Sequence, residues 1–183
     1  MKKCPVCKVE LNQMTLEADL PAYGCSQCQG LWLSANEYLA WLQVQPAQSA
    51  ETIAPDMPLP SFDTTKAILC PDCGHILRRY KIWPEIEFHL DRCGNCNGIW
   101  FDQNEWQVLK ARHLHHQVNL FFTEAWQQKL RTAETRQRFE KMYLDRFGAD
   151  DYTEIKRIRA WLSAHPHRPG LMAYLADDDP YKG

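Results

Sequence analysis

The sequence has little of what a membrane-bound or exported protein needs. It contains no run of 18 apolar residues, so no segment is expected to span a bilayer. Its first ten residues, MKKCPVCKVE, lack the apolar core of about 7 to 15 residues that defines a secretory signal peptide. We therefore expect a protein of the reducing cytoplasm.

The sequence also has no large excess of positive or negative charge. The 183 residues include 21 basic and 23 acidic side chains, which gives a formal charge of −2, and no long block of either sign occurs. Composition therefore does not predict a polybasic arm for nucleic acid. The sequence likewise lacks Gly-x-Ser-x-Gly, a phosphate-binding loop and His-Glu-x-x-His, so we do not expect an enzyme.

What the sequence does contain is an internal repeat. Cys4-Pro5-x-Cys7 recurs as Cys70-Pro71-x-Cys73, and Cys25-x-x-Cys28-x-Gly30-x-Trp32 recurs as Cys93-x-x-Cys96-x-Gly98-x-Trp100. The match continues beyond the cysteines, at Leu11 with Leu77, Leu33 with Phe101, Asn36 with Asn104 and Glu37 with Glu105. One module of about 40 residues therefore occurs twice.

All eight cysteines lie in these Cys-x-x-Cys pairs. Within each copy, 17 or 19 residues separate the two pairs, a spacing typical of a zinc site with four cysteine ligands. Four disulfides would need an exported protein, and a thioredoxin-like redox role needs only one such pair. We therefore predict two structural zinc ions per chain, bound by Cys4, Cys7, Cys25 and Cys28 and by Cys70, Cys73, Cys93 and Cys96.

The segment between the cysteine pairs is predicted to form a β-hairpin. Ile86, Phe88 and Leu90 alternate with polar residues, and a turn is expected near Trp83-Pro84-Glu85. The first copy offers a weaker alternation that we expect Pro21 to end. After each Gly-x-Trp, Ser34 and Asp102 stand three residues before a glutamate, which predicts a helix start with a capping box. We expect these helices over residues 35–45 and 103–116.

Composition divides the chain into four regions. Residues 1–45 contain the first copy of the zinc-binding module, which we call the first ribbon, and residues 67–117 contain the second copy, the second ribbon. Between them lies a proline-rich linker, 46–66, and after them a helical C-terminal region without cysteine, 118–183. The predicted fold class is therefore α+β, with two small zinc-stabilised domains and an all-α C-terminal region that forms a small bundle or hairpin. A module of this size cannot bury enough surface to fold alone, so zinc should supply folding free energy.

The histidines and tryptophans of the repeats have more ordinary interpretations. His75, His89, His113, His115 and His116 are interpreted as surface or packing residues, because complete cysteine sets leave them no coordination position. Trp32 and Trp100 could be binding hot spots, but packing against hairpin and helix is the favoured interpretation. Gly30 and Gly98 are expected to relieve a tight turn.

These residues resemble the zinc ribbons named after transcription factor IIB. The second copy keeps that family's pattern at Cys70, Pro71, Cys73, Leu77, Cys93, Cys96, Gly98, Trp100, Asp102 and Glu105. The first copy has Ser34 where the family has Asp, and both residues cap helices. The resemblance covers residues 4–42 and 70–110 and implies zinc binding. It does not imply transcription, since function must be argued from sites.

Two functional hypotheses follow. The first is a non-catalytic adaptor or scaffold, in which tandem ribbons and the C-terminal helices recognise a protein or nucleoprotein partner. The alternative is direct nucleic-acid binding, with ribbon aromatics stacked on bases and with Arg79, Lys81 and Arg92 on phosphates. It would gain support if those cations converged with the basic residues of the tail. Neither hypothesis fixes the oligomeric state.

Overall fold

The computed structural model describes residues 1–45 and 63–182. Most of the predicted linker, residues 46–66, therefore lies outside the described residues. The chain divides into two compact units, Met1–Arg131 and Thr132–Gly183. The first unit extends past residue 117, where composition placed the end of the second ribbon.

Both ribbons have the same order of elements. The first runs β1 (Asn12–Thr15), a 3-10 turn (Glu17–Asp19), β2 (Pro21–Gly24), β3 (Leu31–Leu33) and α1 (Ala35–Val44). The second runs β4 (Leu77–Lys81), β5 (His89–Cys93), β6 (Ile99–Phe101) and α2 (Glu105–Ala111). Two hairpin-and-helix modules of this kind, followed by helices, confirm the predicted α+β class.

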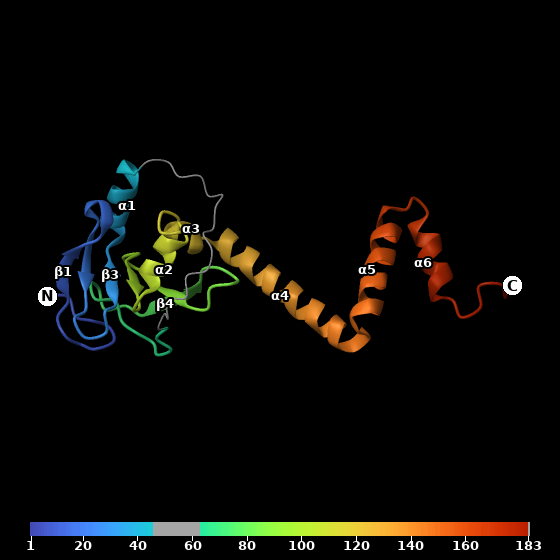
Figure 1. The fold of residues 1–183 in the computed structure, drawn as a ribbon, viewed down its shortest axis with the longest axis horizontal. Helices are drawn as coiled ribbons and strands as arrows, with labels where there is room; N and C mark the ends of the chain where they lie inside the picture. The colour runs from blue at the N-terminus through green and yellow to red at the C-terminus, as the bar shows by residue number, and fades with distance from the viewer. Residues whose placement is uncertain (46–62, 183) are drawn as a thin grey trace. The chain divides into compact units, whose positions relative to one another are not determined.

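The two ribbons share one antiparallel sheet of six strands, in the order β1-β2-β3-β6-β5-β4. Figure 1 shows the strands of the first ribbon running beside those of the second. The seam is the pairing of β3 with β6, where Trp32 lies opposite Trp100, Leu31 opposite Phe101 and Leu33 opposite Ile99. The equivalent residues Trp32 and Trp100 thus meet at a local pseudo-twofold axis, which exchanges the two flanking pairs.

Strand alternation gives this sheet two different faces. On the helix face, Leu31, Leu33, Ile99 and Phe101 pack with Tyr38 and Trp41 of α1 and with Trp106 and Leu109 of α2. On the opposite face, the tryptophan face, Trp32 and Trp100 pack with Leu11, Leu77 and buried cysteines. The core of the first unit is therefore common to both ribbons.

Four local expectations need correction, the first being that β5 begins only at His89, after Ile86 and Phe88, which alternation places in a strand. Pro21 begins β2 instead of ending a run, because proline is tolerated at the first position of a strand. The helix α2 begins at Glu105, two residues later than predicted, after Asn104 in a left-handed conformation. It also ends earlier, at Ala111, and His113 follows with φ of 57°. A backbone bend that helical periodicity does not reveal therefore shortens this helix.

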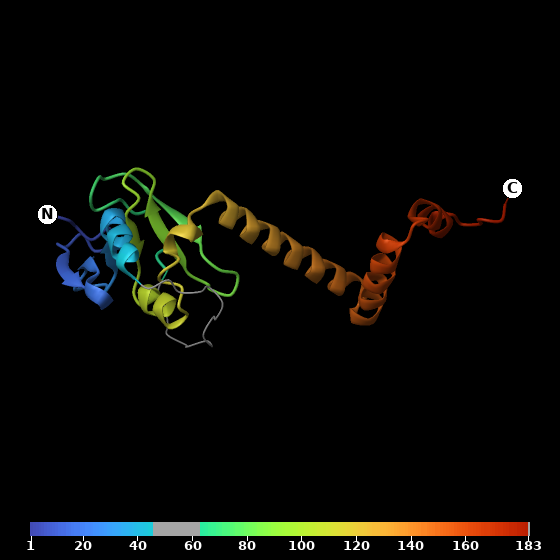
Figure 2. The same ribbon diagram turned by 90° about the horizontal axis from the view of Figure 1, so that it is seen from above.

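The remainder of the first unit closes the helix face. A short helix, α3 (Val118–Phe121), precedes α4 (Glu124–Phe147). The indole of Trp126 donates to the carbonyl of Ile82 at 2.9 Å, and the amide of Gln127 donates to the carbonyl of Lys81 at 2.8 Å. The first two turns of α4 are therefore anchored to the second ribbon (Figure 2).

The second unit contains the rest of α4 and two further helices, α5 (Ala149–Ala164) and α6 (Arg168–Ala176). Gly148, with φ of 79°, separates α4 from α5, a position and conformation typical of a glycine that ends a helix. Leu162 is the one buried side chain among residues 132–182. The expected bundle therefore has no packed core within the described part of this unit. None of the helices described is long and apolar enough to cross a bilayer.

Candidate metal centres

Four similar turns present the eight cysteines. In each turn the first cysteine carbonyl accepts a hydrogen bond from the residue four positions later, as in Lys8 to Cys4 and Asn97 to Cys93, both at 3.0 Å. That later residue has positive φ in all four turns, at Lys8, Gln29, Gly74 and Asn97. A turn of this shape directs two thiols separated by two residues toward one point.

The turns bring each predicted set of four sulfurs together. In both groups the four sulfur atoms lie within 4.8 Å of one another. Sulfur–sulfur distances are 3.6 Å between Cys4 and Cys28, 3.5 Å between Cys70 and Cys96, and 3.4 Å between Cys73 and Cys93. Tetrahedral zinc with Zn–S bonds of about 2.3 Å requires sulfur atoms about 3.8 Å apart, so the donor sets fit this ion.

Two structural zinc ions therefore belong to this chain, one in each ribbon. In each set the first cysteine of each pair is buried and the second is half-buried. Four thiolates complete a tetrahedral shell and leave no position for a substrate or water. The bound ion would join the two turns of its ribbon, which lie side by side at the open end of the hairpin, one before its first strand and one after its second.

Backbone amides stabilise the thiolate form of several ligands. The amide of Cys7 donates to the sulfur of Cys4 at 3.2 Å, and the amide of Asp72 donates to the sulfur of Cys70 at 3.4 Å. The amide of His75 acts in the same way on Cys73 and is the largest of several contacts that lower the pKa of that thiol to about 5, whereas burial raises the pKa of the Cys4 and Cys70 thiols. Because zinc binds thiolates, these amides favour the form that the ion needs.

No histidine joins either cysteine set among the residues that the structure describes. His115 is buried between the rings of Trp41 and Trp106 beneath the helix face, at centroid distances of 6.1 and 5.8 Å. His116 stacks on Trp41 at 4.9 Å. These two side chains therefore pack, in agreement with the interpretation from sequence.

The two metal centres are linked through the Gly-x-Trp segments of the repeat. Trp32 and Trp100 are both fully buried, and each lies over the glycine of the opposite ribbon. A β-carbon at Gly30 would stand 2.2 Å from the Trp100 ring, and one at Gly98 would stand 2.2 Å from the Trp32 ring. These glycines therefore make room for the other ribbon's indole, a role that sequence reasoning missed.

Polar contacts reinforce this link. The indole nitrogen of Trp32 donates to Asp72 at 3.0 Å, and Lys2 forms an ion pair with the same carboxylate. Asp72 lies between the cysteines of the second ribbon's first turn, whereas Lys2 and Trp32 belong to the first ribbon. The first zinc turn of the second ribbon is therefore in direct contact with the first ribbon.

The cations proposed to meet nucleic acid do not share one surface. Strand register places Arg79 opposite Asp91 and Arg78 opposite Arg92, so Arg79 and Arg92 project from opposite faces of the sheet. Arg79 forms an ion pair with Asp63, and Arg92 lies 4.9 Å above the ring of Phe122. Both side chains are thus engaged inside the first unit.

Comparison with known proteins agrees with this geometry. The family described as "Transcription factor zinc-finger", the zinc ribbon of transcription factor IIB type, matches residues 3–44 and residues 69–112. The chain therefore carries two zinc ribbons in tandem, and both copies of the repeat resemble this family, as predicted. Neither the curated proteins nor the solved structures gave a match.

Proposed function

We propose that this protein is a non-catalytic adaptor, in which the paired zinc ribbons form a rigid base and the C-terminal helices bind a partner protein. The observation that carries this proposal is the exposed apolar surface of the second unit. Ten large apolar side chains there are 37% to 61% exposed: Phe139, Met142, Tyr143, Leu144, Phe147, Ile155, Trp161, Met172, Tyr174 and Leu175. Three of them, Phe139, Tyr143 and Phe147, lie in contact along α4, and an exposed apolar patch is typical of a protein-binding site.

The arrangement of these side chains supports docking along a helix. Phe139, Tyr143 and Phe147 lie at i, i+4 and i+8 on one face of α4. Their rings stack in sequence, with centroid distances of 6.4 and 5.8 Å. An amphipathic face of this kind buries its aromatic anchors in a partner's groove. Two closed Cys4 sites give no support to catalysis at zinc.

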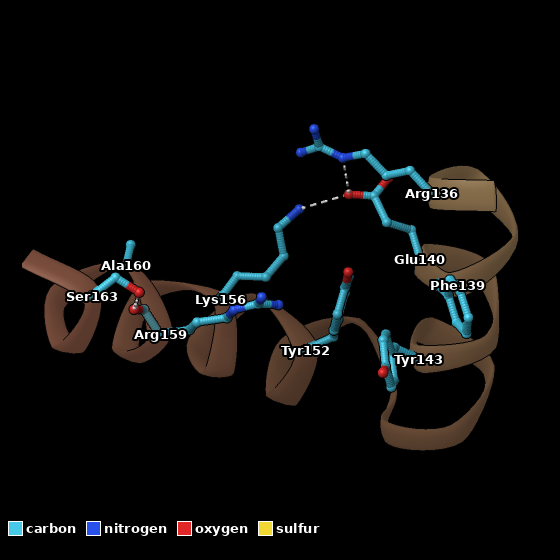
Figure 3. Close-up of a pocket in the computed structure, with 9 residues that line it drawn as sticks. All are labelled: Arg136, Phe139, Glu140, Tyr143, Tyr152, Lys156, Arg159, Ala160 and Ser163. Carbon is cyan, nitrogen blue, oxygen red and sulfur yellow. Dashed lines mark hydrogen bonds and ion pairs between the residues drawn. The ribbon is translucent and has the colours of Figure 1, made fainter. Parts of the chain in front are cut away.

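Direct nucleic-acid binding is a second candidate, favoured by one groove in the second unit. Figure 3 shows this groove of about 600 Å³ between α4 and α5, with aromatic rings beside cationic side chains. Tyr143 and Tyr152 stack at 6.0 Å, while Arg136 and Lys156 both pair with Glu140. Aromatic rings among cations are typical of single-strand binding. The internal engagement of Arg79 and Arg92 favours the adaptor instead.

Native mass spectrometry of the zinc-loaded chain, purified from its own host, tests the adaptor proposal. We compare it with Phe139→Ser/Tyr143→Ser, which alters the exposed face of α4, and with Leu39→Ser, an equally exposed apolar side chain on α1. We expect all three to hold two zinc ions. A nuclease-resistant protein partner should remain bound to the unaltered chain and to Leu39→Ser and should be lost from the double variant.

Other outcomes contradict this proposal in different ways. A nuclease-sensitive ligand that is lost from Lys156→Gln would support nucleic-acid binding instead of the adaptor proposal. A dimer of this chain that only the double variant abolishes would assign the apolar face to self-association. A partner retained equally by all variants would show that this face of the C-terminal helices does not bind it.

A further inference from the structure

A cluster of carboxylates that shares no residue with either cysteine set lies at the edge of the tryptophan face. Oxygen atoms of Asp63, Asp102 and Glu105 lie within 4.8 Å of one another. They come from three separate places: the segment before the second ribbon, the residue after β6, and the first residue of α2. Asp91 of β5 is close enough to interact electrostatically with Asp63, Asp102 and Glu105.

The cluster is buried with more negative than positive charge. Glu105, Asp91 and Asp102 are 1%, 3% and 6% exposed. Arg79 forms an ion pair with Asp63, and His89 lies 3.0 Å from the same carboxylate. Among the described residues, one arginine thus faces four carboxylates. Ionised carboxylates in such a site need a further positive charge or a proton, because burial of an uncompensated charge is costly.

Hydrogen bonds fix most of the carboxylate oxygens and leave two of them free. The backbone amide of Asp102 donates to Oε2 of Glu105 at 2.8 Å. Asp102 itself accepts from the indole of Trp100 at 2.7 Å and from the amide of Thr64. Within residues 1–45 and 63–182, Oε1 of Glu105 and Oδ1 of Asp63 accept no hydrogen bond although both are buried. Such oriented, unpartnered oxygens are what a bound cation would satisfy.

The first ribbon shows that the fold does not require this cluster. By repeat alignment, Tyr23 occupies the place of Asp91, Ser34 that of Asp102 and Glu37 that of Glu105. Both Tyr23 and Asp91 lie opposite the ribbon's tryptophan, so the backbone positions correspond. The first ribbon forms the same hairpin and helix with a phenol and a hydroxyl in place of two carboxylates. Asp102 and Glu105 follow the pattern of the resembled family, so Asp91 and Asp63 are the acids beside them that the repeat does not explain.

We propose that Asp63, Asp102 and Glu105, supported by Asp91, form a third metal site that binds one hard divalent cation such as Ca²⁺ or Mn²⁺. Carboxylate oxygens are the ligands that these ions prefer, whereas the two cysteine sets select zinc. The cation would also bind the segment at Asp63 to the sheet and to α2. A proton is the competing occupant, since burial and neighbouring carboxylates raise the pKa of Glu105 well above its usual range.

Terbium luminescence tests this proposal on the full, zinc-loaded chain. Tb³⁺ is a hard, oxygen-seeking ion, and the Trp100 indole that donates to Asp102 is positioned to sensitise its emission. We expect sensitised emission that saturates at one Tb³⁺ per chain and that Ca²⁺ competes away. Asp63→Asn should weaken Tb³⁺ binding at least tenfold, while Glu10→Gln, a matched change at an exposed acid of the first ribbon, should not.

Two bound zinc ions and an unchanged circular dichroism spectrum show that each variant is folded. Asp91→Asn is a second variant that alters the cluster. Ca²⁺ should raise the melting temperature of the unaltered chain and of Glu10→Gln, and should raise that of Asp63→Asn less. Emission that is absent, or equal in Asp63→Asn and Glu10→Gln, would overturn the cation site. A proton would then be the occupant, and Asp63→Asn would make the stability less dependent on pH.

Discussion

Gly98 shows at the residue scale how little space the contact between the ribbons leaves. Its α-carbon lies under the Trp32 indole, which is fully buried and cannot turn away. Its own φ is not in the left-handed region, and the positive φ of this turn belongs to Asn97. The glycine is therefore needed for close approach and not for backbone conformation.

Gly98→Ala should consequently destabilise the first unit by roughly 2 to 3 kcal/mol, because an added methyl group would displace a close-packed indole. Urea unfolding of the zinc-loaded protein, followed by tryptophan fluorescence, measures this change. Gly94→Ala in the same turn is the matched control, since its β-carbon would meet only the Arg78 guanidinium at 3.9 Å. Equal midpoints for the two variants would contradict the proposed close contact.

His115, which is buried beneath the helix face, should make the stability of the first unit depend on pH. Burial lowers its pKa to about 4, and the neighbouring His116 acts in the same direction. The unfolded chain would bind this proton near pH 6.5, so the folded state loses stability as pH falls from about 6.5 towards 4. Above that range the imidazole is neutral in both states and contributes no pH dependence.

Between pH 7 and pH 5, this one group should reduce the free energy of unfolding by about 2 kcal/mol. Urea titrations at both pH values measure the loss, and His115→Gln removes the titrating group. Cysteine protonation affects both proteins alike, so the difference between them isolates His115. An identical loss in the variant would show that the imidazole titrates normally.

At the scale of elements, α4 belongs to two units. Its first turn packs on the second ribbon through Trp126, and Leu130 in the next turn is buried, whereas its later turns carry exposed aromatic residues. The sequence predicts one helix over residues 123–147 because its helical signals are continuous. Contacts with β4 and with the residues after it decide where the unit ends, and no local pattern reveals them.

A chain that ends at Arg131 should therefore unfold within about 0.5 kcal/mol of the full protein, since both cores remain complete. A chain that ends at Phe122 should lose several kcal/mol, because it lacks Trp126 and its hydrogen bond to Ile82. Zinc content and urea midpoints of both truncated chains provide the measurement. A large loss on removal of residues 132–183 alone would mean that the second unit stabilises the first.

Helix starts illustrate how far sequence reasoning reaches. The glutamate half of the capping box forms in the second ribbon, where the Asp102 amide donates to Glu105. The other half does not, because the Asp102 side chain accepts from Trp100 and Thr64. Ser34 precedes α1 as predicted but makes no side-chain capping bond. Local patterns thus find helices to within a few residues, while distant partners decide how each side chain is used.

At the scale of the whole molecule, the cysteine spacing allowed the ligand sets and the metal to be predicted before any coordinates. The sequence did not predict that the two modules share a sheet, because the pairing of β3 with β6 depends on contacts between residues 66 to 70 positions apart. Nor did it reveal the carboxylate cluster, since Asp63 is separated in sequence from the acids beside it. Ligand sets that depend on short spacings in the sequence can be predicted from it, whereas contacts between residues far apart in the sequence cannot.

A shared sheet means that the two zinc ions should be held cooperatively. Cys7→Ser removes one ligand from the first site and should also speed release of the second ion to a chelator about tenfold, which corresponds to about 1.4 kcal/mol of lost support. Chelator-monitored zinc release and native mass spectrometry measure both ions separately. Cys73→Ser, the same change in the second ribbon, should act on the first ion in return. Unchanged release of the remaining ion in both variants would show that the sites are independent.

The symmetric seam has a consequence for how such a chain can arise. Because β3 and β6 present the same positions to each other, a single ribbon of this type has the surface to pair with a second copy of itself. Joining two copies in one chain keeps that contact at high effective concentration and removes the need for both halves to stay alike. The two halves do differ: at equivalent positions one half carries Tyr23 and Ser34, and the other carries Asp91 and Asp102. A duplicated ribbon can thus keep the contact between its halves permanently, while residues outside that contact are free to differ in the second half.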